Sequence, residues 1–210
     1  MRFLELFRRR PSICDAESLA DFIDQHAAFL VQKGMYEYSR ARAGHYSKVL
    51  FREPAFLAAI EQARWRAFPL GLAMVGEVVE GVLRPLYRDD RPRGVAAVRE
   101  VVLAVFDRYE VPAPLDAPFW CSARADLAHR LDLVGLHPVK RVIDIPEMFA
   151  SAYFDLMPIH EKLRGRDFPT THNYLKVVLC NVHEELVRKI DKAAVVGALL
   201  PAADSTAPRR

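Results

Sequence analysis

The chain has 210 residues, of which 51% are hydrophobic and 27% are charged. A chain of this length most simply forms one folded domain, and this balance of residues excludes wholesale disorder. The 30 basic and 27 acidic residues leave a net charge of +3, which is too small to indicate a nucleic-acid-binding surface, so we do not expect nucleic acid as a partner.

The first predicted element is a basic and apolar arm over residues 1–11, with the sequence MRFLELFRRRP. A short helix here would place apolar side chains beside arginines, but an isolated helix needs about 12–15 residues to be stable. We therefore expect the arm to pack on its own domain or on a protein partner. Attachment to a membrane surface is the alternative.

Residues 12–192 carry apolar side chains at helical spacing almost throughout, which predicts a single all-α domain. Asp15 can cap a first helix that Gly34 would end, and a second helix follows to about Phe51. Pro54 suits the first turn of a third helix. Further elements are expected at 54–66, 68–86, 95–109, 117–134, 148–163 and 170–190, with a charged loop at 88–94. These segments predict a compact irregular bundle of about seven or eight helices.

Two features interrupt the C-terminal part of this pattern. Pro158 lies inside the predicted helix 148–163, where its ring removes one hydrogen bond and leaves the carbonyl of Phe154 without its helical partner. Residues 193–210 have the composition of a tail, although the apolar run AAVVGALL at 193–200 can dock as a final turn. We therefore expect the domain to end near residue 192.

The segment LGLAMVGEVVEGVLRPL, from Leu70 to Leu86, is apolar over most of its helical circumference. Glu77, Glu80 and Arg84 fall within a sector of about 60° on the other side, and we call these three residues the polar stripe. Long charged side chains in one stripe usually meet water, so we expect the stripe to be exposed, with Glu80 and Arg84 at ion-pair spacing. In the alternative, the stripe faces an internal cavity, where a carboxylate with a raised pKa could transfer a proton or bind a ligand.

Two histidines lie on apolar helix faces, His26 in the first helix and His160 in the segment after Pro158. We expect both to be core residues with hydrogen-bond partners, because buried polar groups need such partners. The alternative is that they join Glu77 and Glu80 in a metal-binding or catalytic site.

The segment MYEYSRARAGHY combines aromatic and arginine side chains at helical spacing. Tyr38, Arg42 and Tyr46 follow one another at steps of four residues, and Tyr36 precedes Arg40 by the same step. We expect a solvated face in which the rings pack and the hydroxyls reach water. The alternative is a patch that binds an anion or stacks on an aromatic ligand.

Motifs for phosphate binding, dinucleotide binding, serine hydrolases and zinc proteases are missing from the sequence, so no enzyme class, cofactor or metal site is predicted. The cysteines Cys14, Cys121 and Cys180 lie far apart and form no CxxC pair, which is typical of reduced thiols in the cytoplasm. No run of about 20 apolar residues could span a bilayer. The Ala-, Arg-, Val- and Leu-rich composition is compatible with a bacterial source.

Our leading hypothesis is a cytoplasmic helical binding or protein-interaction protein. It would carry an apolar groove lined by the central helix and by the helices of His26 and His160, and its partner would be a protein, a small apolar ligand or a second copy of the chain. The first alternative is a helical-bundle metal protein or enzyme that uses Glu77 and Glu80 with both histidines. The second is a membrane-surface adaptor that binds through the N-terminal arm.

Overall fold

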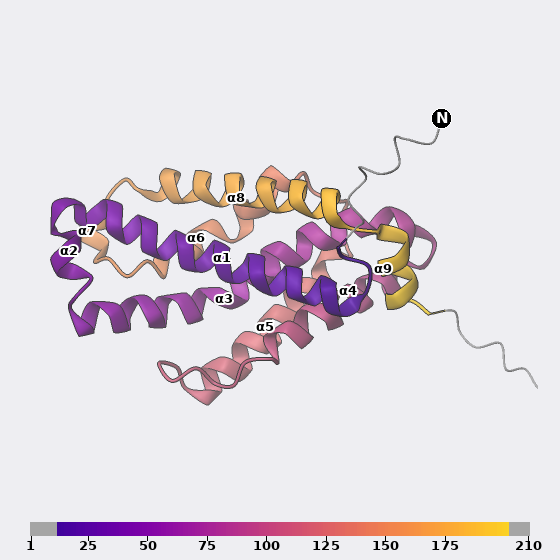
Figure 1. Cartoon of the computed structure of the whole chain (residues 1–210), viewed down its shortest axis with the longest axis horizontal. Coiled ribbons are helices and arrows are strands. Elements are labelled where there is room, and N and C mark those ends of the chain that lie inside the picture. Colours follow the sequence, from indigo (N-terminus) through magenta and orange to yellow (C-terminus); the bar gives the residue numbers. More distant parts are fainter. Residues whose placement is uncertain (1–11, 202–210) are drawn as a thin grey trace, which may run out of the picture.

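The computed structural model describes residues 12–201, and this part of the chain is an all-α bundle, as predicted (Figure 1). Its helices are α1 (Ala16–Ala43), α2 (Ser47–Leu50), α3 (Pro54–Leu83), α4 (Arg91–Phe106), α5 (Ala117–Val134), α6 (Ala150–Asp155), α7 (Glu161–Arg164), α8 (Phe168–Lys189) and α9 (Lys192–Leu199). The predictions for the N-terminal arm concern residues 1–11, which lie outside the described part of the chain.

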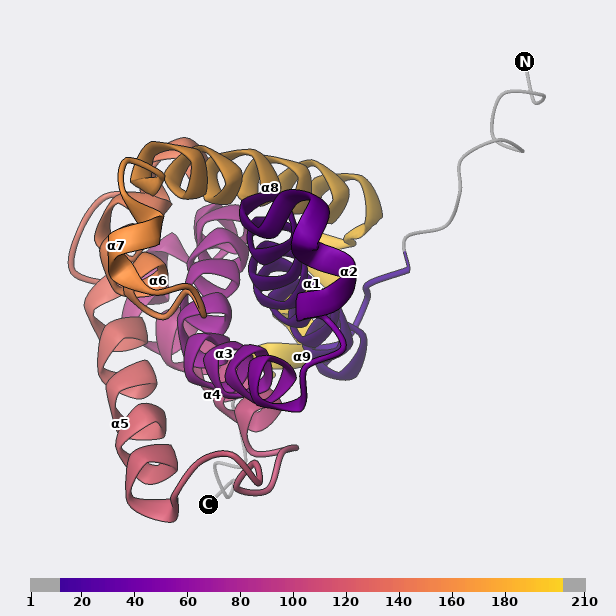
Figure 2. The same ribbon diagram turned by 90° about the vertical axis from the view of Figure 1, so that its left-hand side faces the viewer.

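Helix α3 forms the centre of the bundle and packs against α1, α4, α5 and α8. Seen end-on, α8 covers one side of α1 and α3, while α5 flanks α3 on another (Figure 2). The two separate helices predicted at 54–66 and 68–86 are one continuous helix that runs through Pro69. Burial explains this, because Ala67, Phe68 and Leu72 around the proline are all core residues. Their packing outweighs the single hydrogen bond that proline removes.

The predicted helix stop at Gly34 is wrong, because α1 continues to Ala43. Gly34 instead allows two tyrosine side chains to pack closely against α1. A Cβ built at this position would lie 2.2 Å from Oη of Tyr153 and 2.8 Å from Cε1 of Tyr174. The helix ends at Gly44, whose φ of 54° lies in the left-handed region that favours glycine. The separate second helix to Phe51 is therefore also wrong.

The predicted segment 148–163 is helical on both sides of a break at Pro158, as expected, but the two helices are shorter than predicted. Residues Val142–Met148 form a 3₁₀-helix, α6 ends at Asp155, and the short α7 follows. Pro158 cannot bond to the carbonyl of Phe154, and the guanidinium of Arg164 donates to that carbonyl at 2.5 Å instead. The break thus changes the chain direction without leaving the carbonyl unpaired.

Two further boundaries differ from the prediction. In the predicted charged loop 88–94, residues Arg88–Asp90 form a short 3₁₀-helix and the rest is the first turn of α4. Within the predicted tail, α9 packs on α1 and α4 and buries Val195 completely. A parallel bridge between Ile13 and Ile190 fixes the chain beside α9, with the Asp191 N–H donating to the carbonyl of Ile13 at 2.8 Å.

Candidate functional site

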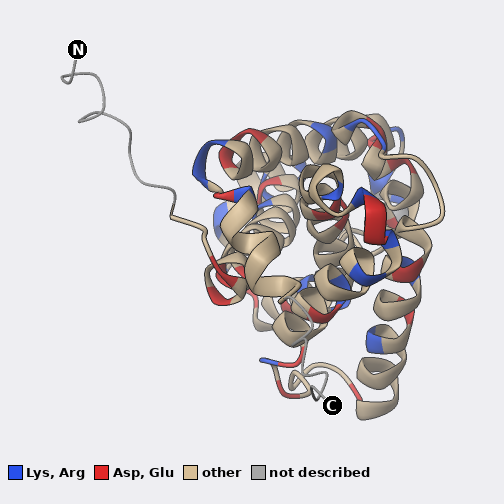
Figure 3. Cartoon of the chain, turned by 90° about the vertical axis from the view of Figure 1, so that its right-hand side faces the viewer, with Lys and Arg blue, Asp and Glu red and all other residues tan. Residues whose placement is uncertain are grey.

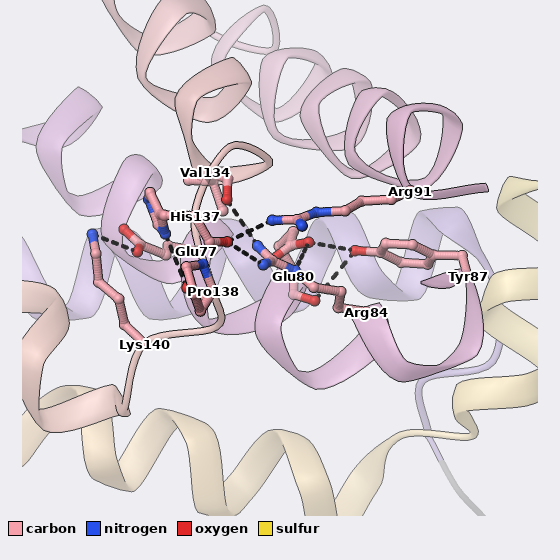
Figure 4. A network of polar contacts seen from close by, with 9 residues as sticks. All are labelled: Glu77, Glu80, Arg84, Tyr87, Arg91, Val134, His137, Pro138 and Lys140. Atoms are coloured by element: carbon pink, nitrogen blue, oxygen red, sulfur yellow. Dashed lines mark hydrogen bonds and ion pairs between the residues drawn. The ribbon is translucent and has the colours of Figure 1, made fainter. Parts of the chain in front are cut away.

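Glu80 and Arg84 of the polar stripe form a buried ion pair at the C-terminal end of α3. The guanidinium donates from Nε to Oε1 of Glu80 at 2.6 Å and from Nη2 to Oε2 at 2.5 Å. The prediction that this stripe is exposed is wrong, because Glu80 is 2% and Arg84 8% exposed. The chain that follows α5 covers this side of α3 (Figure 4).

The Arg84 guanidinium links α3 to the end of α5. It donates to the carbonyl of Val134 at 2.8 Å and to that of His137 at 2.6 Å, and Arg91 donates to the same His137 carbonyl at 2.5 Å. The last carbonyls of a helix have no partner within the helix. Arg84 therefore caps α5 and fixes the loop that follows it.

Tyr87 completes this network by donating its hydroxyl to Oε1 of Glu80 at 2.9 Å. Burial raises the pKa of Tyr87 above its usual range, and the charge of Glu80 raises it further, so the phenol remains protonated and acts as a donor. Both oxygens of Glu80 are occupied by donors from the protein. This arrangement suits the positioning of a loop, not proton transfer.

Glu77, the third residue of the stripe, is 5% exposed and pairs with Lys140, whose Nζ lies 2.8 Å from Oε1 (Figure 4). Glu77 also borders a hollow of about 410 Å³, which His183 and Lys192 line as well. The structure therefore pairs Glu77 with Lys140, and neither of the histidines predicted as its partners, His26 and His160, lines this hollow.

His26 lies in a different place, in a groove between α1 and α8 with a volume of about 470 Å³. Its side chain is 12% exposed, and its Nε2 lies 3.7 Å from Oε2 of Glu185, which is too far for a hydrogen bond. Within the described residues, Nε2 has no hydrogen-bond partner, contrary to the expectation for a core histidine. Burial lowers the pKa of His26, and the charge of Glu185 opposes this shift only in part.

The walls of this groove are mainly apolar. Phe29 and Val177 stand at its surface with exposures of 48% and 60%, and Val178 and Val182 form buried parts of the α8 wall. The polar side chains that line the groove are Gln25, His26, Lys33, Asn181 and Glu185. An apolar hollow with a few polar groups is typical of a small-molecule site. The predicted groove was to be lined by the central helix, whereas this groove is lined by α1 and α8, without α3 and without His160.

His160 is exposed, in contrast to its predicted core position, because the helix that would have carried it ends at Asp155. Its Nδ1 accepts a hydrogen bond from the backbone N–H of Lys162 at 3.2 Å. His26, His160 and the pair Glu77 and Glu80 therefore do not share one site. In the described part of the chain, no three His, Cys, Asp or Glu side chains are grouped so that they could hold a metal ion.

The predicted aromatic and arginine patch is divided between separate places. Tyr38 donates to Asp167 at 3.0 Å, and Arg42 pairs with the same carboxylate at 3.1 Å. Burial, followed by the hydrogen bond to Asp167, raises the pKa of Tyr38 to about 12. Tyr36 and Arg40 line another hollow, of about 240 Å³, and Tyr46 is 66% exposed against the ring of His45.

Several partners in these sites were not found by sequence reasoning. Lys140, Asp167 and Val177 come from segments far along the chain from the residues they meet, so no local spacing pointed to them. Tyr87 follows Glu80 by seven residues, which is two helical turns, and this spacing was a usable signal.

Charge is mixed over the surface. On the face shown in Figure 3, acidic and basic residues alternate along the helices and do not gather by sign. None of the described helices is both long enough and apolar enough to cross a membrane.

The described residues therefore form an all-α bundle with a buried polar network around Arg84 and an apolar groove around His26. In comparisons with family models, with curated proteins and with solved structures, the chain matches none.

Proposed function

We propose that this protein is a cytoplasmic binding protein whose ligand is a small, mainly apolar molecule held between α1 and α8. The observation that carries the proposal is the groove of about 470 Å³ around His26. Sites for small molecules have volumes of about 300–1,000 Å³ and combine apolar walls with a few polar groups. The cytoplasmic location is supported by Cys14, Cys121 and Cys180, which are all free.

The walls favour a small molecule over a partner helix. A helix that docks into a groove buries several apolar anchors spaced along its length, and the groove must offer a matching row of apolar contacts. Phe29 and Val177 are the exposed large apolar side chains of this groove, and Lys33 lies over the Phe29 ring at 5.0 Å. A compact apolar ligand would pack between these two side chains. A polar atom of the ligand would be directed at His26 or Lys33.

The neutral dye N-phenyl-1-naphthylamine tests this proposal, because its fluorescence rises in apolar surroundings. We expect the dye to bind the protein, and Val177→Arg to weaken the binding at least about tenfold by placing a charge in the groove. Val49→Arg is the matched control, since Val49 is 61% exposed, close to the 60% of Val177, and lies outside the groove.

Equal dye binding by the wild type and by Val177→Arg would count against the groove as the site. An equal loss in Val49→Arg would show a general effect of surface charge, and it too would count against the proposal. Circular dichroism of both variants verifies that the fold is retained.

A further inference from the structure

Another hollow, of about 230 Å³, lies between α3, α5 and α6, away from the groove of His26. Its apolar lining includes Pro69, Leu70 and Leu127, and two arginines border it, Arg66 from α3 and Arg130 from α5. We call this hollow the arginine cleft.

Both arginines of the cleft are held by aromatic rings and not by acidic side chains. The guanidinium of Arg66 lies 5.1 Å from the centre of the Phe119 ring, and that of Arg130 lies 5.6 Å from the centre of the Phe149 ring. Within the described part of the chain, neither arginine makes an ion pair or a hydrogen bond through its side chain. A guanidinium that stacks on a ring keeps its in-plane N–H donors free for an oxyanion.

Asp126 is the third charged residue that lines the arginine cleft. It forms no ion pair with either arginine in the described structure. Two arginines and one aspartate leave the cleft with one net positive charge. Charge complementarity therefore favours an anion, and the apolar lining favours an anion that carries a hydrocarbon body.

We propose that the arginine cleft binds a small organic anion, with its oxyanion head held by Arg66 and Arg130 and its apolar body packed against Pro69, Leu70 and Leu127. The two arginines supply paired N–H donors of the geometry that carboxylates and phosphates accept. This site does not depend on the groove between α1 and α8.

Isothermal titration calorimetry with octanoate, octyl phosphate and 1-octanol tests the inference. These probes share one hydrocarbon chain, and the two anions distinguish a carboxylate head from a phosphate head. We expect at least one anion to bind about tenfold or more tightly than 1-octanol. Arg66→Gln and Arg130→Gln should each weaken its binding about tenfold, because each removes charge-assisted hydrogen bonds.

One surface variant serves as a control, and one variant within the cleft tests the sign of the charge that the ligand carries. Arg52→Gln removes the same charge from an exposed arginine outside the cleft and should leave the affinity unchanged. Asp126→Asn removes the one negative charge of the cleft and should tighten anion binding a few-fold. Circular dichroism of each variant verifies the fold.

Three results would overturn the inference: neither anion binds the wild type, 1-octanol binds as tightly as the anions, or the double variant of Arg66 and Arg130 retains full affinity. Val177→Arg separates this site from the other groove. If that variant abolished octanoate binding, the anion would sit between α1 and α8, and the arginine cleft would be excluded while the proposed function stood.

Discussion

The buried polar groups have hydrogen-bond partners in the network around Arg84, whereas a buried polar group lacks one in the groove around His26. In the network, Glu80 and Arg84 are 2% and 8% exposed, and Arg84 satisfies two backbone carbonyls in addition to its carboxylate. In the groove, Nε2 of His26 has no hydrogen-bond partner among the described residues and lies beside an open hollow.

This difference separates polar groups that stabilise the fold from polar groups that are available to bind a ligand. A buried polar group that is satisfied by the protein fixes the fold and has little left to offer a ligand, whereas an unsatisfied group beside a cavity gains from a ligand that supplies its missing partner. The charged residues that stood out most in the sequence, Glu80 and Arg84, belong to the first kind.

The largest expected effect comes from Arg84→Met, which disrupts the buried network around Arg84. The variant leaves the Glu80 charge buried without its partner and the carbonyls of Val134 and His137 without that donor. We expect a loss of about 3–5 kcal/mol in the free energy of unfolding, measured by urea denaturation. Arg141→Met is the control: its side chain is 80% exposed and pairs with Asp144 at the surface, so it should leave stability almost unchanged.

Gly34→Ala tests the packing beneath the groove. Its Cβ would overlap Oη of Tyr153 and the ring of Tyr174, which lines the groove, so both rings must move. We expect a loss of about 1–3 kcal/mol in the same denaturation experiment. At Gly197, in α9, a Cβ meets nothing within 4 Å, so Gly197→Ala should stabilise the protein by up to about 1 kcal/mol. Equal effects of the two substitutions would contradict this account.

Tyr87→Phe removes one hydroxyl from the network and keeps the ring. Because Glu80 retains both bonds from Arg84, we expect a loss of only about 1 kcal/mol in the free energy of unfolding. Tyr46→Phe removes a hydroxyl from a 66% exposed ring and should have no measurable effect. A loss as large as that of Arg84→Met would mean that the tyrosine, not the arginine, holds the loop.

The smallest expected effect concerns the pH dependence of the groove. Burial lowers the pKa of folded His26 below its ordinary value of 6.5, so the unfolded chain binds the proton first as the pH falls. The contribution of His26 to stability is therefore fully present above about pH 6.5 and is lost as the pH falls toward the folded pKa. His26→Gln should reduce the difference in the free energy of unfolding between about pH 8 and about pH 5.

The sequence predicted the fold class and several helix ends because these depend on neighbouring residues. Asp15 and Asp116 cap α1 and α5 through their own side chains, as their positions before apolar runs indicated. The i,i+4 ion pair of Glu80 and Arg84 also forms as its spacing predicted. Gly34 does not end α1; it lies where two tyrosines from the C-terminal half occupy the space that a side chain would need, and its own sequence neighbourhood gave no sign of them.

The candidate site was harder to predict, because burial depends on segments that are distant in the sequence. The spacing of the polar stripe gave its position on α3 correctly, yet the loop containing His137 and Lys140 covers it. The groove depends in the same way on α8, whose Val177 and Glu185 have no sequence relation to His26. Periodicity describes one helix at a time and does not say which neighbour will cover it.

The pairing of Ile13 with Ile190 bears on the order in which the molecule can assemble. Helix α1 contributes one wall of the groove, and its partners α8 and α9 are the last described helices to leave the ribosome. During synthesis, α1 can pack early against α3, its main neighbour. The part of α1 that α8 and α9 cover stays open until those helices, more than a hundred residues later, have been made, and this delay exposes it to premature association. A ligand of the groove can bind only a chain that has been synthesised through α8.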